Sequence, residues 1–397
     1  MHLKGKPIGT DLLHADHDDD KNRSEVAPSI SVTTTFRGAD PRHGLEHSDL
    51  LDPLNPSRHV YSRYTQDVSH RAEKILSKIN GGFALTYSSG LAASYAALVH
   101  YAPKRVAITD GYHGFHSTLE VYKKSKGSGF QVIGLDDDFQ TGDICWLETP
   151  LNPTGESRNI KYYADKVHAV GGHLIVDSTF APPPLQYPLK FGADAVMHSG
   201  TKYLGGHSDL LCGVLVVKTA AEWNKLWSDR TYTGNMMGSL ESWLLLRSLR
   251  TLHLRVPRQS SNATELVQWL HKLSGVPADQ RLDGIQGGII EKVWHSSLQA
   301  QTASWDIRAQ MEGGWNATFG IFLRNKEHAA LLPFLLRNFT PATSLGGVES
   351  LIEQRLQSDP GADPRLVRIS VGVEDIEDLK DDLREAFKRL VKEKPKL

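Results

Sequence analysis

The sequence has few cysteines and almost no net charge. Cys145 and Cys212 are its only cysteines, and each lies within an apolar run. Two such cysteines argue against a disulfide framework and favour a reducing compartment. The formal net charge at neutral pH is -1, so no broad field attracts nucleic acid or an anionic membrane. The charge balance therefore favours a small-molecule partner, with no nucleic acid and no membrane.

Long hydrophobic runs are also absent. No apolar stretch is long enough to span a bilayer. The N-terminal segment lacks the apolar core of a signal peptide, and it carries too many acids for a typical transit peptide. We therefore predict a cytoplasmic protein. The acids and histidines at 14–20 are so dense that a hydrated segment is favoured over a metal site.

Strand-like runs alternate with helix-length segments from residue 59 onward. Short β-rich runs in this arrangement predict an α/β fold, with a mostly parallel sheet covered by helices on both faces. In such sheets, ligands bind beyond the carboxyl ends of the strands. The expected strands lie at 83–87, 105–109, 131–135, 143–149, 173–177, 195–199 and 213–217.

Three segments are expected along the chain. Residues 1–58 are polar, contain one strand-like piece at 29–36, and predict an N-terminal arm. Residues 59–256 form the predicted large domain, which ends with a long helix stopped near Pro257. Residues 257–397 predict a smaller α+β domain that ends in an amphipathic helix.

The clearest chemical signal lies between Asp177 and Asp209. The apolar run HLIVD ends in Asp177, and Lys202 follows in the small, hydroxylated setting HSGTK. Such neighbours leave room and hydrogen-bond donors for an anion. An acid and a lysine on one α/β sheet indicate pyridoxal 5'-phosphate (PLP), with the lysine as Schiff base and the acid keeping the pyridine nitrogen protonated. The alternative is a strand ended by a capping Asp and an unrelated exposed lysine.

One turn and three single residues carry weaker signals. Ser89 and Gly90 lie in a strand-to-helix turn, which either binds a phosphate or is plain turn geometry. Tyr112 either stacks on a flat ring or is an ordinary loop tyrosine. Asn152 precedes a proline, so it is either a ligand donor or a turn residue. Arg368 lies on an apolar strand, where either a substrate carboxylate or an internal acid is its expected partner.

With these residues assembled, the chain resembles the cystathionine γ-synthase, γ-lyase and β-lyase family of PLP-dependent trans-sulfuration enzymes. The likeness covers nearly the whole length and centres on the lysine motif DAVMHSGTKYLGGHS. It implies the fold of type I PLP-dependent transferases and a homotetramer of two active dimers. The companion motifs, in the order of the family, are YSR (61–63), SSGLAA (88–93), ETPLNPTG (148–155), VDSTFAPP (176–183), SLGGVESL (344–351) and RISVGVED (368–375).

The resemblance also implies a role for each matching residue. Lys202 would hold PLP and move protons, Asp177 would pair with the ring nitrogen, and Tyr112 would stack on the ring and help to deprotonate the incoming amine. The implied substrate-carboxylate contacts are Asn152, Ser344 and Arg368. The implied phosphate contacts are Ser89, Gly90, Leu91, Ser199 and Thr201, with Tyr61 and Arg63 reaching the phosphate of a neighbouring subunit.

Three departures from the family pattern bear on the substrate. Val60 and Thr343 stand where γ-synthases and γ-lyases carry acids, and Ser117 stands where some members carry an arginine that reads a distal carboxylate. Without that cation, a succinyl ester or the far zwitterion of cystathionine would leave a desolvated carboxylate unpaired. A neutral leaving group, such as acetate from O-acetyl-L-homoserine, fits better. We therefore expect γ-replacement or γ-elimination through a vinylglycine-type intermediate, with substrate contacts that include Thr343.

Two alternatives remain open. One is a cystathionine β- or γ-lyase that cleaves a C–S bond, and pyruvate or 2-oxobutyrate as product would tell β- from γ-elimination. The other is a catalytically silent homologue that binds PLP or a partner protein. The joint presence of Lys202, Asp177, Tyr112 and Arg368 argues against the silent homologue.

Overall fold

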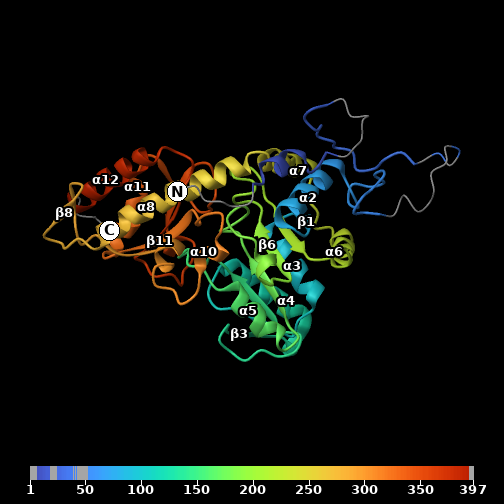
Figure 1. The fold of residues 1–397 in the computed structure, drawn as a ribbon, viewed down its shortest axis with the longest axis horizontal. Helices are drawn as coiled ribbons and strands as arrows, with labels where there is room; N and C mark the ends of the chain where they lie inside the picture. The colour runs from blue at the N-terminus through green and yellow to red at the C-terminus, as the bar shows by residue number, and fades with distance from the viewer. Residues whose placement is uncertain (1–6, 18–24, 39, 41, 43–51, 393–397) are drawn as a thin grey trace.

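A computed structural model describes residues 7–17, 25–38, 40, 42 and 52–392 (Figure 1). Its larger sheet has the strand order β1-β7-β6-β5-β4-β2-β3. Strand β7 runs antiparallel to β1 and β6, whereas the other neighbouring strands pair in parallel. The predicted α/β class with a mostly parallel sheet is therefore confirmed. The strands are β1 (Phe83–Tyr87), β2 (Arg105–Ala107), β3 (Gln131–Ile133), β4 (Ile144–Glu148), β5 (His173–Asp177), β6 (Ala195–Ser199) and β7 (Gly213–Val217).

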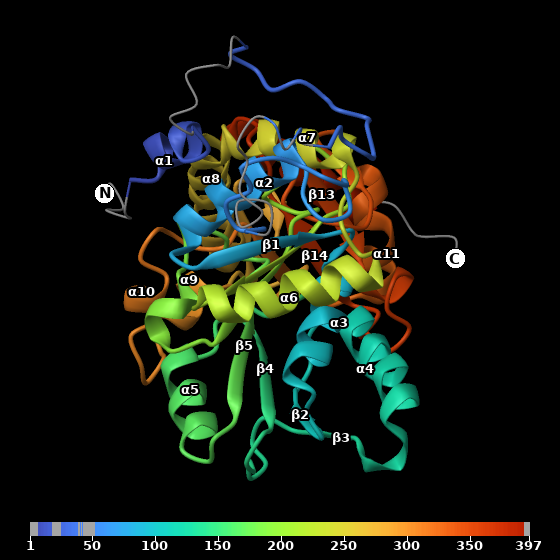
Figure 2. The ribbon, with the colours of Figure 1, turned by 90° about the vertical axis from the view of Figure 1, so that its right-hand side faces the viewer.

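Helices cover both faces of this sheet because successive strand residues point to opposite faces. On β4, Cys145 and Leu147 pack in the core shared with α2 (Asp67–Asn80) and α5 (Ile160–His168). Trp146, between them, packs in a second core shared with α3 (Gly90–Tyr101), α4 (His113–Lys126) and α6 (Ala220–Thr233). Figure 2 shows α5 on one side of β4 and β5, and α3 and α4 on the other.

Two helices lead from the larger sheet into the C-terminal unit. Helix α7 (Ser239–Leu249) is followed by α8 (Leu252–Ser274), with a short break at Arg250 and Thr251. The prediction of a helix end near Pro257 is wrong, because α8 runs through this proline. A proline inside a helix costs about 3 kcal/mol, but buried residues on both sides of Pro257 pack into the core and offset that cost. The predicted domain border at 256/257 stays a prediction and falls within α8.

A second sheet, with strand order β10-β11-β14-β13-β12, organises the C-terminal unit. Its helix α12 (Ile376–Lys392) buries Leu379, Leu383, Phe387 and Leu390, as its amphipathic pattern predicts. Figure 1 shows this unit, in orange and red, beside the cyan and green larger unit. Its strands are β10 (Ile290–Trp294), β11 (Thr318–Leu323), β12 (Phe339–Pro341), β13 (Ser350–Gln354) and β14 (Leu366–Ser370). Smaller elements are β8 (Arg281–Leu282), β9 (Ile285–Gln286), α9 (Ser296–Gln299), α10 (Ile307–Gln310), α11 (Lys326–Leu335) and the 3-10 turns η3 (Gly127–Gly129), η4 (Pro188–Phe191) and η5 (Arg355–Gln357).

The N-terminal arm contains helix α1 (Gly9–His14). The strand expected at 29–36 is wrong, because only an isolated bridge from Thr35 to Tyr61 forms there. Asp16 is buried between Arg71 and Arg250, at 2.7 Å from each, so this acid belongs to a buried ion cluster rather than to a hydrated segment. Asp18, Asp19 and Asp20 lie outside the described residues. None of the helices in the described ranges has the length and apolar character needed to cross a bilayer.

Candidate active site

One cavity of about 490 Å³ lies where β4, β5 and β6 end, against the C-terminal unit. It brings together every predicted site residue except Tyr61 and Arg63. This position, beyond the carboxyl ends of parallel strands, is the usual ligand site of such sheets. The predicted residues that line the cavity are Ser89, Gly90, Leu91, Tyr112, Asn152, Asp177, Ser199, Thr201, Lys202, Thr343, Ser344 and Arg368.

Lys202 lies in the turn that follows β6. Its backbone N–H donates to the Ser199 carbonyl at 3.1 Å, and its Nζ donates to Ser344 Oγ at 2.8 Å. Burial and the nearby charge of Arg368 lower the pKa of Lys202 from 10.5 to about 8, while Glu353 opposes the shift. The exposed-lysine alternative is therefore wrong. The neutral, nucleophilic amine is accessible near physiological pH.

Two buried acids lie side by side on neighbouring strands. Glu148 and Asp177 are partners in the parallel register of β4 and β5. Burial raises the pKa of Asp177 to about 6, although hydrogen bonds from Thr179 oppose the shift. Burial and the adjacent Asp177 raise the pKa of Glu148 to about 8. A cation placed beside Asp177 would favour its ionised form.

Hydrogen bonds fix both carboxylates. Asp177 Oδ1 accepts from the backbone N–H and the hydroxyl of Thr179, at 3.0 and 2.6 Å. Glu148 accepts from the backbone N–H groups of Tyr112 and Asn152, at 2.8 and 2.7 Å. The sequence interpretation gave no role to Glu148 or Thr179. The strand register of Glu148 with Asp177 is the signal that would have identified Glu148.

The start of α3 forms one wall of the cavity. Ser89 caps the helix by accepting from the Ala92 N–H at 3.1 Å. A Cβ on Gly90 would lie 3.1 Å from Ser199, so glycine allows the helix start and the end of β6 to approach closely. The free N–H groups and the dipole at a helix N-terminus favour a bound phosphate.

Tyr112 stands at the mouth of the cavity just before α4. The residue is 40% exposed, and its backbone N–H donates to Glu148. A Cβ on Gly114 would come within 2.4 Å of the Tyr112 ring. Only glycine at 114 therefore permits this ring position.

These features fit PLP. Lys202 would supply the amine, and the start of α3 with Ser199 and Thr201 would supply a phosphate site. Asp177 is a buried carboxylate, and within the described part of the chain it accepts hydrogen bonds from Thr179. A protonated ring nitrogen would give it the opposite charge that its burial otherwise lacks.

Arg368 forms the opposite wall with Asn152 and Ser344. Its Nη1 donates to Asn152 Oδ1 at 3.1 Å, and its Nη2 donates to the Ser344 carbonyl at 2.8 Å. Nη2 also lies 2.6 Å from Glu353 Oε1. The internal-acid partner considered for Arg368 is thus present, and Arg368 nevertheless lines the cavity.

Glu353, Arg355 and Ser358 also line the cavity and were missed by the sequence interpretation. No motif marked them, because Arg355 and Ser358 lie in the turn after β13, beyond the matched SLGGVESL segment. Arg355 is thus a cation of the cavity that the sequence interpretation, which concerned only the distal end, did not include. Arg355 is linked through Glu353 to Arg368. The uncharged distal end stays a prediction.

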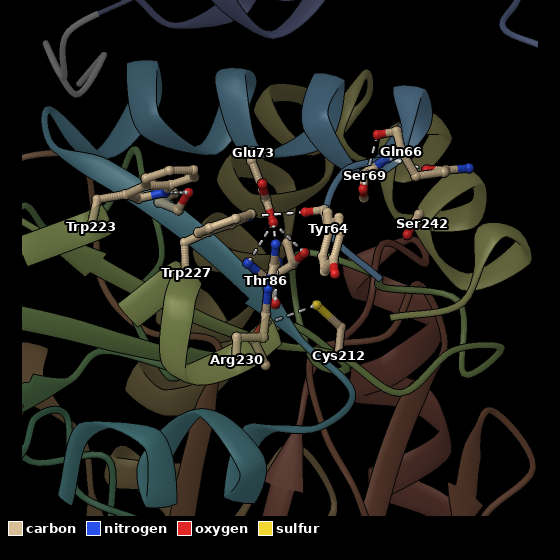
Figure 3. A network of polar contacts seen from close by, with 12 residues as sticks. Tyr64, Gln66, Ser69, Glu73, Thr86, Cys212, Trp223, Trp227, Arg230 and Ser242 are labelled. Atoms are coloured by element: carbon tan, nitrogen blue, oxygen red, sulfur yellow. Dashed lines mark hydrogen bonds and ion pairs between the residues drawn. The ribbon is translucent and has the colours of Figure 1, made fainter. Parts of the chain in front are cut away.

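Tyr61 and Arg63 lie outside the cavity, as their implied role toward a neighbouring subunit requires. Tyr61 is 38% exposed, and Arg63 Nη1 donates to the Thr231 carbonyl at 3.0 Å. Figure 3 shows how α6 holds this segment, with Trp227 Nε1 donating to the Tyr64 carbonyl at 2.8 Å. Their reach into another subunit stays a prediction.

Comparison with known proteins places these features in a family. A family model described as Cys/Met metabolism PLP-dependent enzyme matches residues 9–388. A cystathionine gamma-lyase of Dictyostelium discoideum is 31% identical, over 96% of this chain and 97% of its own length. A cystathionine beta-lyase of Lactococcus lactis subsp. cremoris is 30% identical, with 96% and 99% covered. A cystathionine gamma-synthase/O-acetylhomoserine (thiol)-lyase of Bacillus subtilis is 30% identical, with 96% of each covered.

Solved structures agree with these matches. A methionine gamma lyase from Micromonospora echinospora superimposes with a TM-score of 0.80 at 29% identity, covering 96% of this chain and 99% of its own. A cystathionine gamma-lyase from Lactobacillus plantarum, complexed with L-serine, gives 0.81 at 26% identity, with 97% and 99% covered.

Proposed function

Since the chain belongs to the PLP-dependent enzymes of cysteine and methionine metabolism, we propose that it performs γ-replacement or γ-elimination on a homoserine-derived amino acid such as O-acetyl-L-homoserine. The chain is an enzyme of trans-sulfuration chemistry, and PLP is its cofactor. The choice of substrate and of γ-chemistry is the proposal.

One observation carries it: Ser344 links Lys202 to Arg368. The Ser344 hydroxyl accepts from the Lys202 amine at 2.8 Å, and the Ser344 carbonyl accepts from Arg368 at 2.8 Å. A carboxylate bound by Arg368 and Asn152 would bring the α-carbon of an amino acid close to the amine. The pocket is thus arranged for proton removal at that carbon.

Each residue has a proposed part. Bound PLP supplies an electron-withdrawing ring, which acidifies the substrate α-proton. Lys202 would take that proton, pass it to the bound cofactor, and then take a second proton from the β-carbon, so that the electron pair left there expels the group on the γ-carbon. Its lowered pKa lets the amine exist in both forms near neutral pH. Asp177 holds the ring nitrogen protonated, and Tyr112 covers the ring at the cavity mouth. Ser344 orients the amine of Lys202.

The proposed leaving group is inferred from two uncharged residues, Thr343 and Ser117. Thr343 lines the cavity with a hydroxyl, and Ser117 stands where some relatives in the resembled family carry a cation. A carboxylate at the far end of the substrate would then be desolvated without a partner. The acetyl ester of bound O-acetyl-L-homoserine is uncharged and so needs no such cation.

Incubation with O-acetyl-L-homoserine tests the proposal. We expect acetate release together with 2-oxobutyrate, or with a γ-substituted adduct when a thiol is added. Detection by mass spectrometry identifies the product without a coupled assay. Turnover of cystathionine alone, with the ester inert, would reject the proposal.

The second candidate is a cystathionine lyase. It is favoured by the names of two relatives, a gamma-lyase at 31% identity and a beta-lyase at 30% identity. With cystathionine as substrate, pyruvate would indicate β-elimination and 2-oxobutyrate would indicate γ-elimination.

Assembly and location complete the proposal. We propose a homotetramer built from two active dimers, supported by Tyr61 and Arg63, which lie outside the cavity of their own chain. We also propose a cytoplasmic location, supported by the free, buried thiols of Cys145 and Cys212. Light scattering and fractionation of the source cells test these two points.

A further inference from the structure

Three charged residues form a cluster at the end of the cavity where Arg368 is proposed to bind the substrate carboxylate. Glu353 Oε1 accepts a hydrogen bond from Arg355 Nη1 and forms an ion pair with Arg368 Nη2 at 2.6 Å. Ser358 links the other side, since its hydroxyl accepts from Arg355 Nη1 at 2.9 Å and donates to Glu353 Oε2 at 3.2 Å. We call Glu353, Arg355 and Arg368 the Arg-Glu-Arg cluster.

Strand register and one turn build this cluster. Glu353 and Arg368 are antiparallel partners on β13 and β14, so their side chains share a face. Arg355 opens η5, directly after β13, and its side chain is only 5% exposed. All three residues line the cavity.

The charges of the cluster do not cancel. Two guanidinium groups share the single carboxylate of Glu353, which leaves one positive charge at a buried site. Another acid near Arg355 is Asp359, but it lies 4.0 Å from Nη2 and is 35% exposed, so water screens it. One additional carboxylate, such as that of a bound amino acid, would bring the cluster to neutrality.

Removal of Arg355 changes this balance. Arg368 and Glu353 would then form a neutral pair, and a substrate carboxylate approaching Arg368 would meet the negative charge of Glu353 at close range. At a buried site such a charge is worth about tenfold to a hundredfold in affinity. The effect of Arg355 on substrate binding would therefore act through its charge on Glu353.

We propose that Arg355 is a positioning residue that takes up the charge of Glu353, so that Arg368 keeps its own charge for the substrate α-carboxylate. The inference rests on the proposed function only in that the substrate is an α-amino acid. It does not depend on which leaving group or which γ-reaction is used.

Binding of L-norvaline to the holoenzyme tests the proposal, because norvaline has the α-carboxylate but no leaving group. L-Norvalinamide, which lacks the carboxylate charge, is the matched ligand. By calorimetry, Arg355→Gln should weaken norvaline binding by about tenfold to a hundredfold and leave norvalinamide unchanged. Arg365→Gln is the matched control variant, since Arg365 lies outside the cavity and pairs with Asp363 and Glu291.

Two further variants separate charge from structure. The double variant Arg355→Gln, Glu353→Gln restores one net positive charge, so norvaline affinity should return to near the wild-type value. Arg355→Lys should also recover most of it. In turnover, the effect of Arg355→Gln should fall on KM, with kcat nearly unchanged.

Three results would overturn the proposal. They are equal weakening of norvaline and norvalinamide, no recovery in the double variant, and a fall in kcat without a rise in KM. If Arg355→Gln does not fold, Glu353→Gln alone decides, since it should tighten norvaline binding and a loss of affinity would contradict the idea. Failure to release acetate would reject the proposed substrate but leave these binding results intact.

Discussion

The lowered pKa of Lys202 leads to a measurable reactivity. The structure moves this pKa from 10.5 to about 8, chiefly by burial. At pH 7 roughly one amine in ten would then be neutral, compared with about one in 3000 for an unshifted lysine. Since only the neutral amine attacks an electrophile, the reactive fraction of Lys202 at pH 7 should be about 300-fold larger than its ordinary pKa allows.

Competitive labelling measures this directly. The protein, freed of cofactor with hydroxylamine, is labelled with a trace of acetic anhydride from pH 6 to 11, and the modified peptides are quantified by mass spectrometry. Labelling of Lys202 should rise with pH and reach half of its plateau near pH 8. The exposed Lys161 provides the internal reference. A Lys202 curve with its midpoint near 10.5 would refute the argument.

Two neighbouring charges shift the pKa of Lys202 in opposite directions. Arg368 lowers the pKa of Lys202 and Glu353 raises it. Arg368→Gln should therefore move the labelling midpoint upward, and Glu353→Gln should move it downward. Shifts in the opposite directions would mean that these two residues do not act on the amine through their charge.

The same shift affects stability. The unfolded chain binds more protons at residue 202 between pH 8 and 10.5, so by linkage stability rises with pH in that window. Below pH 8 the charged, buried Lys202 costs the fold about 3 kcal/mol. Such a cost is expected where a residue is placed for reactivity rather than for stability.

Three further predictions follow from buried or crowded positions. Asp177→Asn should lower kcat by about a hundredfold or more, because the ring nitrogen loses its negative partner; a steady-state product assay checks this, and an unchanged kcat would contradict the role of Asp177. Gly114→Ala should push the Tyr112 ring aside, since the new Cβ would lie 2.4 Å from it, and kcat/KM should fall by about a hundredfold with little change in the melting temperature. Asp16→Asn leaves Arg71 and Arg250 without their buried anion and should destabilise the fold by about 3 kcal/mol, which thermal unfolding measures. In the unsubstituted protein, burial opposes the ionisation of Asp16 but arginine hydrogen bonds lower its pKa overall, so this stabilisation is present above pH 3.8 and is lost as the pH falls below it.

Much of the larger sheet could be predicted because its strands are short apolar runs separated by helix-length segments. The strands 83–87, 195–199 and 213–217 begin and end where the sequence places them. Predictions from the local sequence pattern were wrong where tertiary packing overrides the secondary-structure propensity of the residues. Pro257 lies inside α8 because the helix buries residues on both sides of it, and the 29–36 segment has β-branched residues but lacks a neighbouring strand beyond one bridge.

The cavity could be predicted only where a residue belonged to a motif. Lys202, Asp177 and Arg368 lie in matched segments, and the structure brings them together. Arg355 lies two residues beyond Glu353 in a segment without a motif, and its position depends on how the chain turns after β13. No sequence spacing specifies that turn, so its charge at the carboxylate end could not be foreseen.

The two ends of the cavity carry buried groups of opposite charge. At the end of the larger sheet, Glu148 and Asp177 are neighbouring buried acids whose pKa values are both raised. At the C-terminal unit, the Arg-Glu-Arg cluster carries one uncompensated positive charge. A ligand that brings a protonated ring nitrogen to the first end and a carboxylate to the second relieves both costs at once. On the proposed function, we therefore expect these charges to favour a zwitterionic amino acid together with a protonated pyridine ring, and Lys202 to act on that amino acid.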